Sequence, residues 1–115
     1  MKITLPYPPS ALNPNRKAHW AVKARAAKKY KADCTLAILA AGRTTQRLLR
    51  TKTNFSLTFC RPDKRDFDED NAMASMKSGL DALSAYIGID DSKFHYTIQK
   101  GEPVKGGAVI VEVLE

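Results

Sequence analysis

The most constraining feature of this chain is a long stretch without helix breakers. From His19 to Ala41 the sequence contains neither Gly nor Pro and is rich in Ala, Lys, Leu and Ile, which favours an α-helix. Gly42 follows directly and is expected to end the helix. The chain has 115 residues, which fits one domain with a single modest core, so the remaining elements must pack with this helix.

Two segments with period-two patterns predict strands. Residues 2–6 alternate and are stopped by a proline-rich turn, and residues 53–60 alternate so that Phe55, Leu57 and Phe59 share one face. Such a face is expected to cover a core, because successive side chains of a strand point to opposite sides of the sheet.

The second half of the chain predicts one more helix and two more strands. The helix should run from about Asp70 to Tyr86 and end at Gly88. Its apolar residues recur at spacings of three and four: Met73, Met76, Leu80 and Leu83. Residues 94–99 and 108–114 are expected to be strands on either side of a turn-rich stretch.

The resulting order of elements is β-α-β-α-β-β. It indicates an α/β (α+β) fold in which residues 1–115 form a single small domain, with two main helices packed on a mixed β-sheet.

The chain is strongly basic, with 19 Lys and Arg against 12 Asp and Glu, a formal net charge of +7 and a pI near 9.6. Such a charge attracts polyanions, most commonly nucleic acid, although many small proteins are basic for solubility alone. No apolar run is long enough to span a bilayer and no signal-peptide segment is present, so we expect a cytoplasmic protein. Cys34 and Cys60 are then expected to be buried thiols, and the spacing of Cys and His does not predict a zinc site.

Four acids occur within five positions, between the strand at 53–60 and the second helix: Asp66, Asp68, Glu69 and Asp70. One interpretation is that they cap the helix and interact with its dipole. In a chain that is otherwise basic, we favour a bound cation. Mg²⁺ takes a few carboxylate ligands, keeps several waters and can orient a water for attack on a phosphodiester.

Two further features fit a metal site. Asp90 and Asp91, after the second helix, offer a third ligand, although Gly-Ile-Asp-Asp-Ser also fits an ordinary turn. On a continuous helix Lys77 lies within about 40° of Asp70 and Asp81, and there it could contact the scissile phosphate or the leaving oxygen. The alternative for Lys77 is an i,i+4 ion pair with Asp81, worth about a few tenths of a kcal/mol.

Five segments occur in an order that is more specific than any one of them. They are Ile3–Ser10 with Asn13 soon after, the basic run Pro62–Arg65 before Asp68-Glu69-Asp70-Asn71, Lys77 with Asp81-Ala82-Leu83, the turn Ile89-Asp90-Asp91, and Pro103–Gly107. Together they resemble the RusA family of Holliday-junction resolvases, small phage-type endonucleases, over essentially the whole chain. The last segment is similar to the family's C-terminal hairpin.

The resemblance implies a Mg²⁺-dependent endonuclease, encoded by a bacterial phage or prophage, that resolves four-way DNA junctions as a homodimer in recombination and repair. It assigns Asp68, Asp70 and Asp91 to the metal and Lys77 to catalysis. The residues expected to contact DNA are Asn13, Lys64, Arg65, Asn71 and Lys105. Leu5 and Tyr7 are candidates for the face that pairs in the dimer.

Several alternatives stay open. Asp66 forms a rival pair with Asp68, and we favour Asp68 with Asp70 because Asn71 then completes the D-x-D-N pattern. Phe67 is interpreted as a core residue at the strand end, with a wedge that stacks in an open junction as the alternative.

Lys77 lies six residues after Asn71, whereas some family members place the lysine three residues after.

The alternative function is a non-catalytic junction-binding or DNA-binding module of a prophage. A ribonuclease with a His-centred acid/base pair is disfavoured, because His19 and His95 have no supporting neighbours in the sequence.

Overall fold

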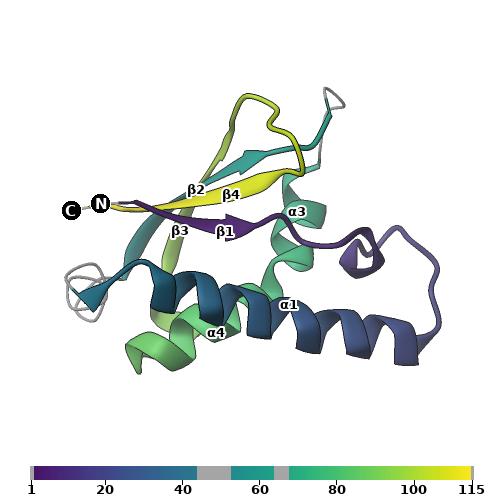
Figure 1. Cartoon of the computed structure of the whole chain (residues 1–115), viewed down its shortest axis with the longest axis horizontal. Helices are drawn as coiled ribbons and strands as arrows, with labels where there is room; N and C mark the ends of the chain where they lie inside the picture. Colours follow the sequence, from purple (N-terminus) through teal and green to yellow (C-terminus); the bar gives the residue numbers. More distant parts are fainter. Residues whose placement is uncertain (1, 44–52, 64–67, 115) are drawn as a thin grey trace.

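The alternating segments form one mixed four-stranded sheet (Figure 1). The computed structural model describes residues 2–43, 53–63 and 68–114. Its strands are β1 (Lys2–Pro6), β2 (Asn54–Cys60), β3 (His95–Lys100) and β4 (Ala108–Val113). They lie in the order β1-β4-β2-β3, with β4 antiparallel to both β1 and β2, and β2 parallel to β3.

This pairing places three carboxyl ends of strands at the same end of the sheet. Because β4 alone is reversed, the carboxyl ends of β1, β2 and β3 lie together, and Pro6, Ala108 and Cys60 share one row of the register. We call this end the carboxyl edge and the opposite end the amino edge. Loops that leave a carboxyl edge are a common place for binding residues in sheets with parallel strands.

The expected C-terminal hairpin is wrong, because β3 and β4 do not pair and β2 lies between them. Residues 101–107 instead cross the carboxyl end of β2. The N–H of Gly101 donates to the carbonyl oxygen of Phe59, and the N–H of Val104 donates to that of Arg61. A side chain at Gly101 would place Cβ 2.7 Å from Cys60 Sγ, so this crossing fits only glycine closely.

The first helix forms where the sequence predicts it. α1 runs from Trp20 to Ala40, and the His19 side chain accepts a hydrogen bond from the N–H of Ala21. Gly42, with φ of +92°, follows the helix as expected for a residue that ends it.

The second predicted helix is divided in two. α3 (Glu69–Ser75) and α4 (Lys77–Ile87) meet at Met76 and run in different directions (Figure 1). Ser75 Oγ donates to the carbonyl oxygen of Asn71 four residues earlier, a bond that commonly bends helices. The expected alignment of residues on one continuous helix therefore does not hold across Met76.

Helices cover one face of the sheet, as predicted. Three-residue 3-10 turns, η1 (Ser10–Leu12) and η2 (Asp91–Lys93), complete the described elements. The core lies between the layers, and its most buried sheet residues are Ile3, Leu5, Phe55, Leu57, Phe59, Val109 and Val111. The helices contribute Tyr30, Cys34, Ile38, Met76, Leu80 and Leu83. The radius of gyration of 13.6 Å matches the roughly 13 Å of a compact domain of this length.

α1 and α4 approach closely at one point. A Cβ at Gly79 of α4 would lie 2.8 Å from Tyr30 Cε2 and 3.0 Å from Cys34 Sγ. The buried Tyr30 hydroxyl donates to the carbonyl oxygen of Pro6 at 2.6 Å, which ties α1 to the end of β1. Burial raises the pKa of Tyr30 and raises the pKa of Cys34 to about 11.

The predicted state of the cysteines is confirmed, since Cys34 and Cys60 are both buried free thiols. In the described ranges, no helix combines the length and apolar character needed to cross a bilayer.

Candidate functional site

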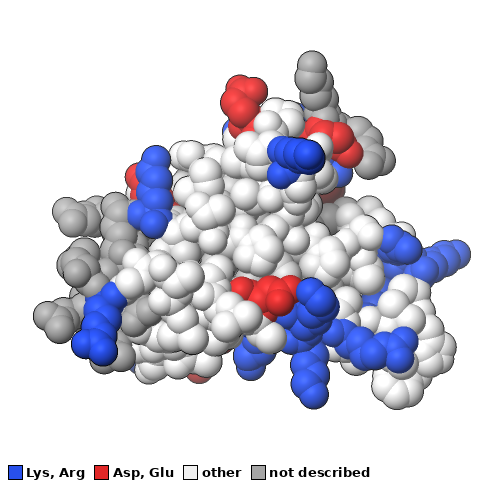
Figure 2. Space-filling model, viewed as in Figure 1, with Lys and Arg blue, Asp and Glu red and all other residues white. Residues whose placement is uncertain are grey.

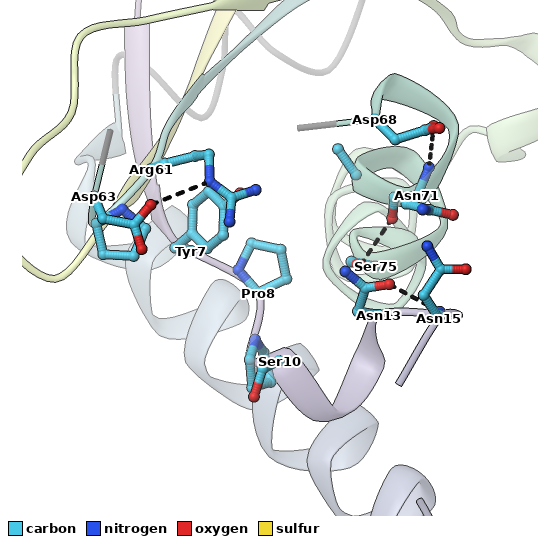
Figure 3. Close-up of a pocket in the computed structure, with 13 residues that line it drawn as sticks. Tyr7, Pro8, Ser10, Asn13, Asn15, Arg61, Asp63, Asp68, Asn71 and Ser75 are labelled. Carbon is cyan, nitrogen blue, oxygen red and sulfur yellow. Dashed lines mark hydrogen bonds and ion pairs between the residues drawn. The ribbon is translucent and has the colours of Figure 1, made fainter. Parts of the chain in front are cut away.

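A pocket of about 470 Å³ opens at the carboxyl edge of the sheet (Figure 3). Three segments that are distant in sequence line it: the turn after β1 with η1, the loop after β2, and one face of α3. The lining residues are Tyr7, Pro8, Pro9, Ser10, Asn13, Asn15, Arg61, Pro62, Asp63, Asp68, Asn71, Ala72 and Ser75. Most of their functional groups are amides, hydroxyls, carboxylates and one guanidinium.

The first wall of the pocket is the proline-rich turn. Its shape is fixed by η1, where the N–H of Asn13 donates to the Ser10 carbonyl oxygen and Asn13 Oδ1 accepts from the N–H of Asn15 at 2.9 Å. Tyr7 packs closely on Gly107, whose added Cβ would lie 2.8 Å from Tyr7 Cβ and whose φ is +74°. Partial burial raises the pKa of Tyr7, so its hydroxyl is a neutral group at pH 7.

The second wall presents Arg61. The residue continues the inward-facing row of Phe55, Leu57 and Phe59 one step beyond β2, so its guanidinium points over the core end into the pocket (Figure 3). Its Nε lies 3.7 Å from Asp63 Oδ1, an ion-pair distance. This Nε is buried and has no hydrogen-bond acceptor within residues 2–43, 53–63 and 68–114.

The third wall begins at Asp68, the N-cap of α3. Asp68 Oδ1 accepts from the N–H of Asp70 at 2.9 Å and from the N–H of Asn71 at 3.2 Å. The capping interpretation of this acid is therefore correct. The other oxygen, Oδ2, takes no part in the cap, so capping does not occupy the whole carboxylate.

The pocket brings together three of the predicted site residues, namely Asn13, Asp68 and Asn71. Asp70 does not line it, because the lining face of α3 carries residues 68, 71, 72 and 75. Lys77 begins α4 beyond the bend and is exposed; in the described part of the chain it forms no ion pair with Asp81. Lys64 and Arg65, with Asp66 and Phe67, lie outside the described residues.

Lys105 does not line the pocket, although it belongs to a loop that contacts two of the lining segments. Its loop crosses the end of β2, where Val104 bonds Arg61 and Gly107 contacts Tyr7 and Pro62. Leu5, a candidate for a dimer face, is 1% exposed and belongs to the core, so it is not available for such a contact.

Asp91 lies at the other end of the sheet. It begins η2, four residues before His95, and His95 pairs with Asn54, the first residue of β2. The backbone of Asp91 is thus at the amino edge, whereas Asp68 follows the carboxyl edge. Asp90 Oδ1 accepts from the N–H of Ser92, which is the ordinary turn that the sequence also allowed.

The predicted set of three metal ligands does not come together within the described part of one chain. No group of three His, Cys, Asp or Glu side chains suited to a metal occurs there. The side chain of Asp91 and the whole of Asp66 are outside the description.

Two charged residues of the pocket, Arg61 and Asp63, had no assigned role in the sequence analysis. A usable signal was present for Arg61, because extending the alternation of residues 55, 57 and 59 places residue 61 on the same face. A guanidinium in that position is expected to be half-buried and directed across the end of the core.

The lining groups suit a hard cation next to an anion. The carboxylates of Asp63 and Asp68 and the amide oxygens of the pocket are oxygen donors, and Mg²⁺ commonly binds through one or two carboxylates while keeping its waters. The Arg61 guanidinium across the pocket suits a phosphate or another oxyanion.

Comparison with known proteins adds one distant relative. A protein of Xylella fastidiosa (strain Temecula1 / ATCC 700964), described as an "Uncharacterized protein", is 26% identical over 113 residues, which cover 96% of this chain and 74% of that protein. No family model matches the chain.

Proposed function

We propose that the protein is a Mg²⁺-dependent, structure-selective DNA endonuclease that resolves four-way junctions by phosphodiester hydrolysis. One observation carries the proposal: a single pocket at the carboxyl edge places the Arg61 guanidinium with the carboxylates of Asp63 and Asp68. Binding and cutting a phosphodiester needs both a positive group for the phosphate and acids for the cation. The resemblance to RusA resolvases and the basic charge support the same choice.

Arg61 is the group best placed to hold the phosphate. Its side chain is 23% exposed and its Nε is buried, so a phosphate bound there would cost little further desolvation of that nitrogen. A charge-assisted hydrogen bond to a phosphate oxygen would satisfy the Nε–H that lacks an acceptor among the described residues. Asn13 and Asn71 line the same space and supply neutral amide groups that orient the backbone without adding charge.

Asp68 would hold the cation, with Asp70 or Asp66 as the second carboxylate that the sequence offers. Bound there, Mg²⁺ supplies Lewis-acid stabilisation of phosphoryl oxygens and activation of a water. Asp68 keeps its carboxylate in place because the cap to Asp70 and Asn71 fixes one oxygen. Asp70 and Lys77 remain predictions from the resemblance.

A homodimer is part of the proposal. Productive resolution requires two nicks in opposed strands, and two identical chains related by a twofold axis present two identical sites. The position of Asp91 adds an argument, because its backbone lies at the edge opposite to Asp68. If Asp91 acts at the same metal as Asp68, it does so from a second copy.

The test compares Asp68→Asn with wild type on a synthetic four-way junction in Mg²⁺. Asn is as good an N-cap as Asp, so the fold should persist while the charge is lost. We expect cleavage to fall by at least roughly a hundredfold, with junction binding retained or improved. Glu112→Gln, which removes one acid from a strand distant from the pocket, is the matched control and should cut normally.

Parallel assays of Asp70→Asn separate the two candidate pairs. If this variant cuts at the wild-type rate, Asp70 is not a ligand, and Asp66 with Asp68 is the pair to test next. Junction binding without cleavage by the wild-type chain, at any Mg²⁺ concentration, would contradict the proposal and favour the non-catalytic DNA-binding module.

A further inference from the structure

The net charge of the chain is concentrated in one segment. Residues 1–32 hold eight of the 19 Lys and Arg and none of the 12 acids, so they contribute +8. The other 83 residues hold eleven Lys and Arg and twelve acids, so they contribute −1 and the whole chain is +7. The positive charge therefore belongs to one part of the molecule rather than to its whole surface.

Most of this charge lies on or just before the first half of α1. The first ten residues of the helix, Trp20–Lys29, include no buried residue, and burial begins at Tyr30. Figure 2 shows lysine and arginine side chains gathered over this end of the helix. We call Arg16–Lys31 the basic arm.

Trp20 makes the basic arm unusual. Its side chain is 75% exposed, and its ring lies 5.5 Å from that of His19. A tryptophan ring carries more apolar surface than almost any other side chain, and an exposed one is free to stack on a ligand. Trp20 is also the sole tryptophan of the sequence.

Trp20 shares one face of α1 with two lysines. Lys28 and Lys31 follow it by eight and eleven residues, which on an α-helix puts all three within about 80° of each other. Each of the three is exposed. With a rise of 1.5 Å per residue they form a stripe about 16 Å long. At about 3.4 Å per nucleotide along a stacked strand, the stripe spans roughly five nucleotides.

We propose that this stripe binds a single-stranded segment of DNA, with an unpaired base stacked on Trp20 and phosphates contacted by Lys28 and Lys31. Indole stacks on any base whose face is free, and this contact depends little on sequence. Duplex DNA offers the lysines the same phosphates but offers Trp20 no free base. The stripe therefore distinguishes opened DNA from duplex.

A second copy of the chain is the other partner that could cover Trp20. Charge argues against it, because an isologous contact through this stripe would bring together two basic arms, neither of which contains an acid. A polyanion removes that repulsion and releases its own counterions on binding.

The basic arm follows one wall of the proposed active pocket in the sequence. Asn13 and Asn15 line the pocket, Arg16 Nη1 donates to Ser10 Oγ at the same wall, and α1 begins four residues later. The inference depends on the proposed function for the choice of DNA, but strand binding is measurable without cleavage.

Intrinsic fluorescence excited beyond the absorption of the four tyrosines provides the direct test, because Trp20 is then the sole emitter. The probe is a 12-residue oligothymidylate, which has no base pairing of its own. We expect quenching on titration of the whole chain with this oligonucleotide, and weaker quenching with a duplex of equal length. Unchanged fluorescence at concentrations where binding is complete by anisotropy of a labelled oligonucleotide would overturn the inference.

Variants then assign the two contacts. Trp20→Ala should weaken oligothymidylate binding by about five- to a hundredfold, and Trp20→Phe should restore most of it. The matched control is Leu36→Ala, an exposed apolar residue of the same helix, which should change nothing. Lys28→Ala/Lys31→Ala should lower the slope of log K against log salt by about 1.4, and the control pair Lys2→Ala/Lys93→Ala should leave the slope unchanged.

The outcomes also separate this inference from the proposed function. Normal strand binding by Trp20→Ala, with cleavage abolished by Asp68→Asn, would refute the stripe and leave the endonuclease in place. Trp20-dependent binding in a chain that never cuts would support the stripe and refute the endonuclease. A dimer that Trp20→Ala converts to a monomer, measured by sedimentation without DNA, would identify the stripe as a contact between copies and overturn the inference.

Discussion

The two halves of α1 are parts of one continuous helix but belong to different environments. From Tyr30 onward the helix buries Tyr30, Cys34 and Ile38 at four-residue spacing against the sheet and α4. Before Tyr30 no residue of the helix is buried, and the side chains are mainly alanine, lysine and arginine. The buried half is held by packing, whereas the first half depends on helix propensity and on its continuity with the buried half.

This difference suggests that the two halves of α1 have different roles, one in folding and one in binding. A helix of 21 residues is about 31 Å long, while the five residues of β1, the strand that α1 contacts, span about 17 Å, so the helix extends beyond that strand. The covered part contributes to folding. The uncovered part can carry charge and an aromatic ring at little cost to the core.

The largest expected effect is in the buried half. Ile38→Ala should lower the free energy of unfolding by about 3 kcal/mol, because Ile38 is fully buried and the substitution leaves a cavity. Leu36→Ala, two residues earlier and 65% exposed, should change it by less than about 0.5 kcal/mol. Urea denaturation of both variants checks the contrast, and equal losses would contradict the burial of this half.

A smaller effect is expected from pH, again through the buried half. The pKa of Cys34 is raised from 9.0 to about 11, and the pKa of Tyr30 is raised from 10.0. Between these values the unfolded chain has released protons that the folded chain still holds, so stability falls as pH rises above about 9. Urea midpoints measured from pH 7 upward should show this decline, and Cys34→Ala should reduce its slope. A rise in stability above pH 9 would contradict the prediction.

The smallest effect is expected in the basic arm. Lys28→Ala/Lys31→Ala should change the free energy of unfolding by less than about 0.5 kcal/mol and in the stabilising direction, because like charges are removed and Ala is the better helix former. The gain should shrink at high salt, which screens the repulsion. A large loss of stability would show that these lysines pack in the folded chain and would remove the contrast between the halves.

The sequence predicted local structure better than it predicted arrangement. The strands at 53–60 and 108–114 and the ends of α1 followed from alternation, from helix formers and from Gly42, which act over a few residues. The predicted helix ran straight through Met76, although Ser75, Ser78 and Gly79 around it are weak helix formers and favour a bend. Its causes are the Ser75 hydroxyl and the contact of Met76 with the Tyr30 hydroxyl at 3.0 Å, a residue 46 positions away.

The candidate site was predicted in the same uneven way. Asp68 and Asn71 were found because they are close in sequence, and Asn13 through the family resemblance. Arg61 was missed because local patterns do not show how far the inward-facing alternation of β2 continues past the end of the strand. The separation of Asp91 from Asp68 depends on the direction of β3, which no local pattern specifies.

The placement of β4 between β1 and β2 has a consequence for the order in which the chain can fold. β1 comes first of the described strands, but its one partner in the described sheet is β4, so Ile3 pairs with Val111, more than a hundred residues later in the chain. The β2–β3 pair and the two long helices can assemble while that partner is still missing. The turn that carries Tyr7 and Asn13 follows β1, so we expect the pocket that it lines to be complete only after β1 has paired with β4. A chain that lacks β4 would therefore have much of its core but not its site. The β1–β4 pairing joins residues far apart in the sequence, so we expect it to be the slow contact of this topology.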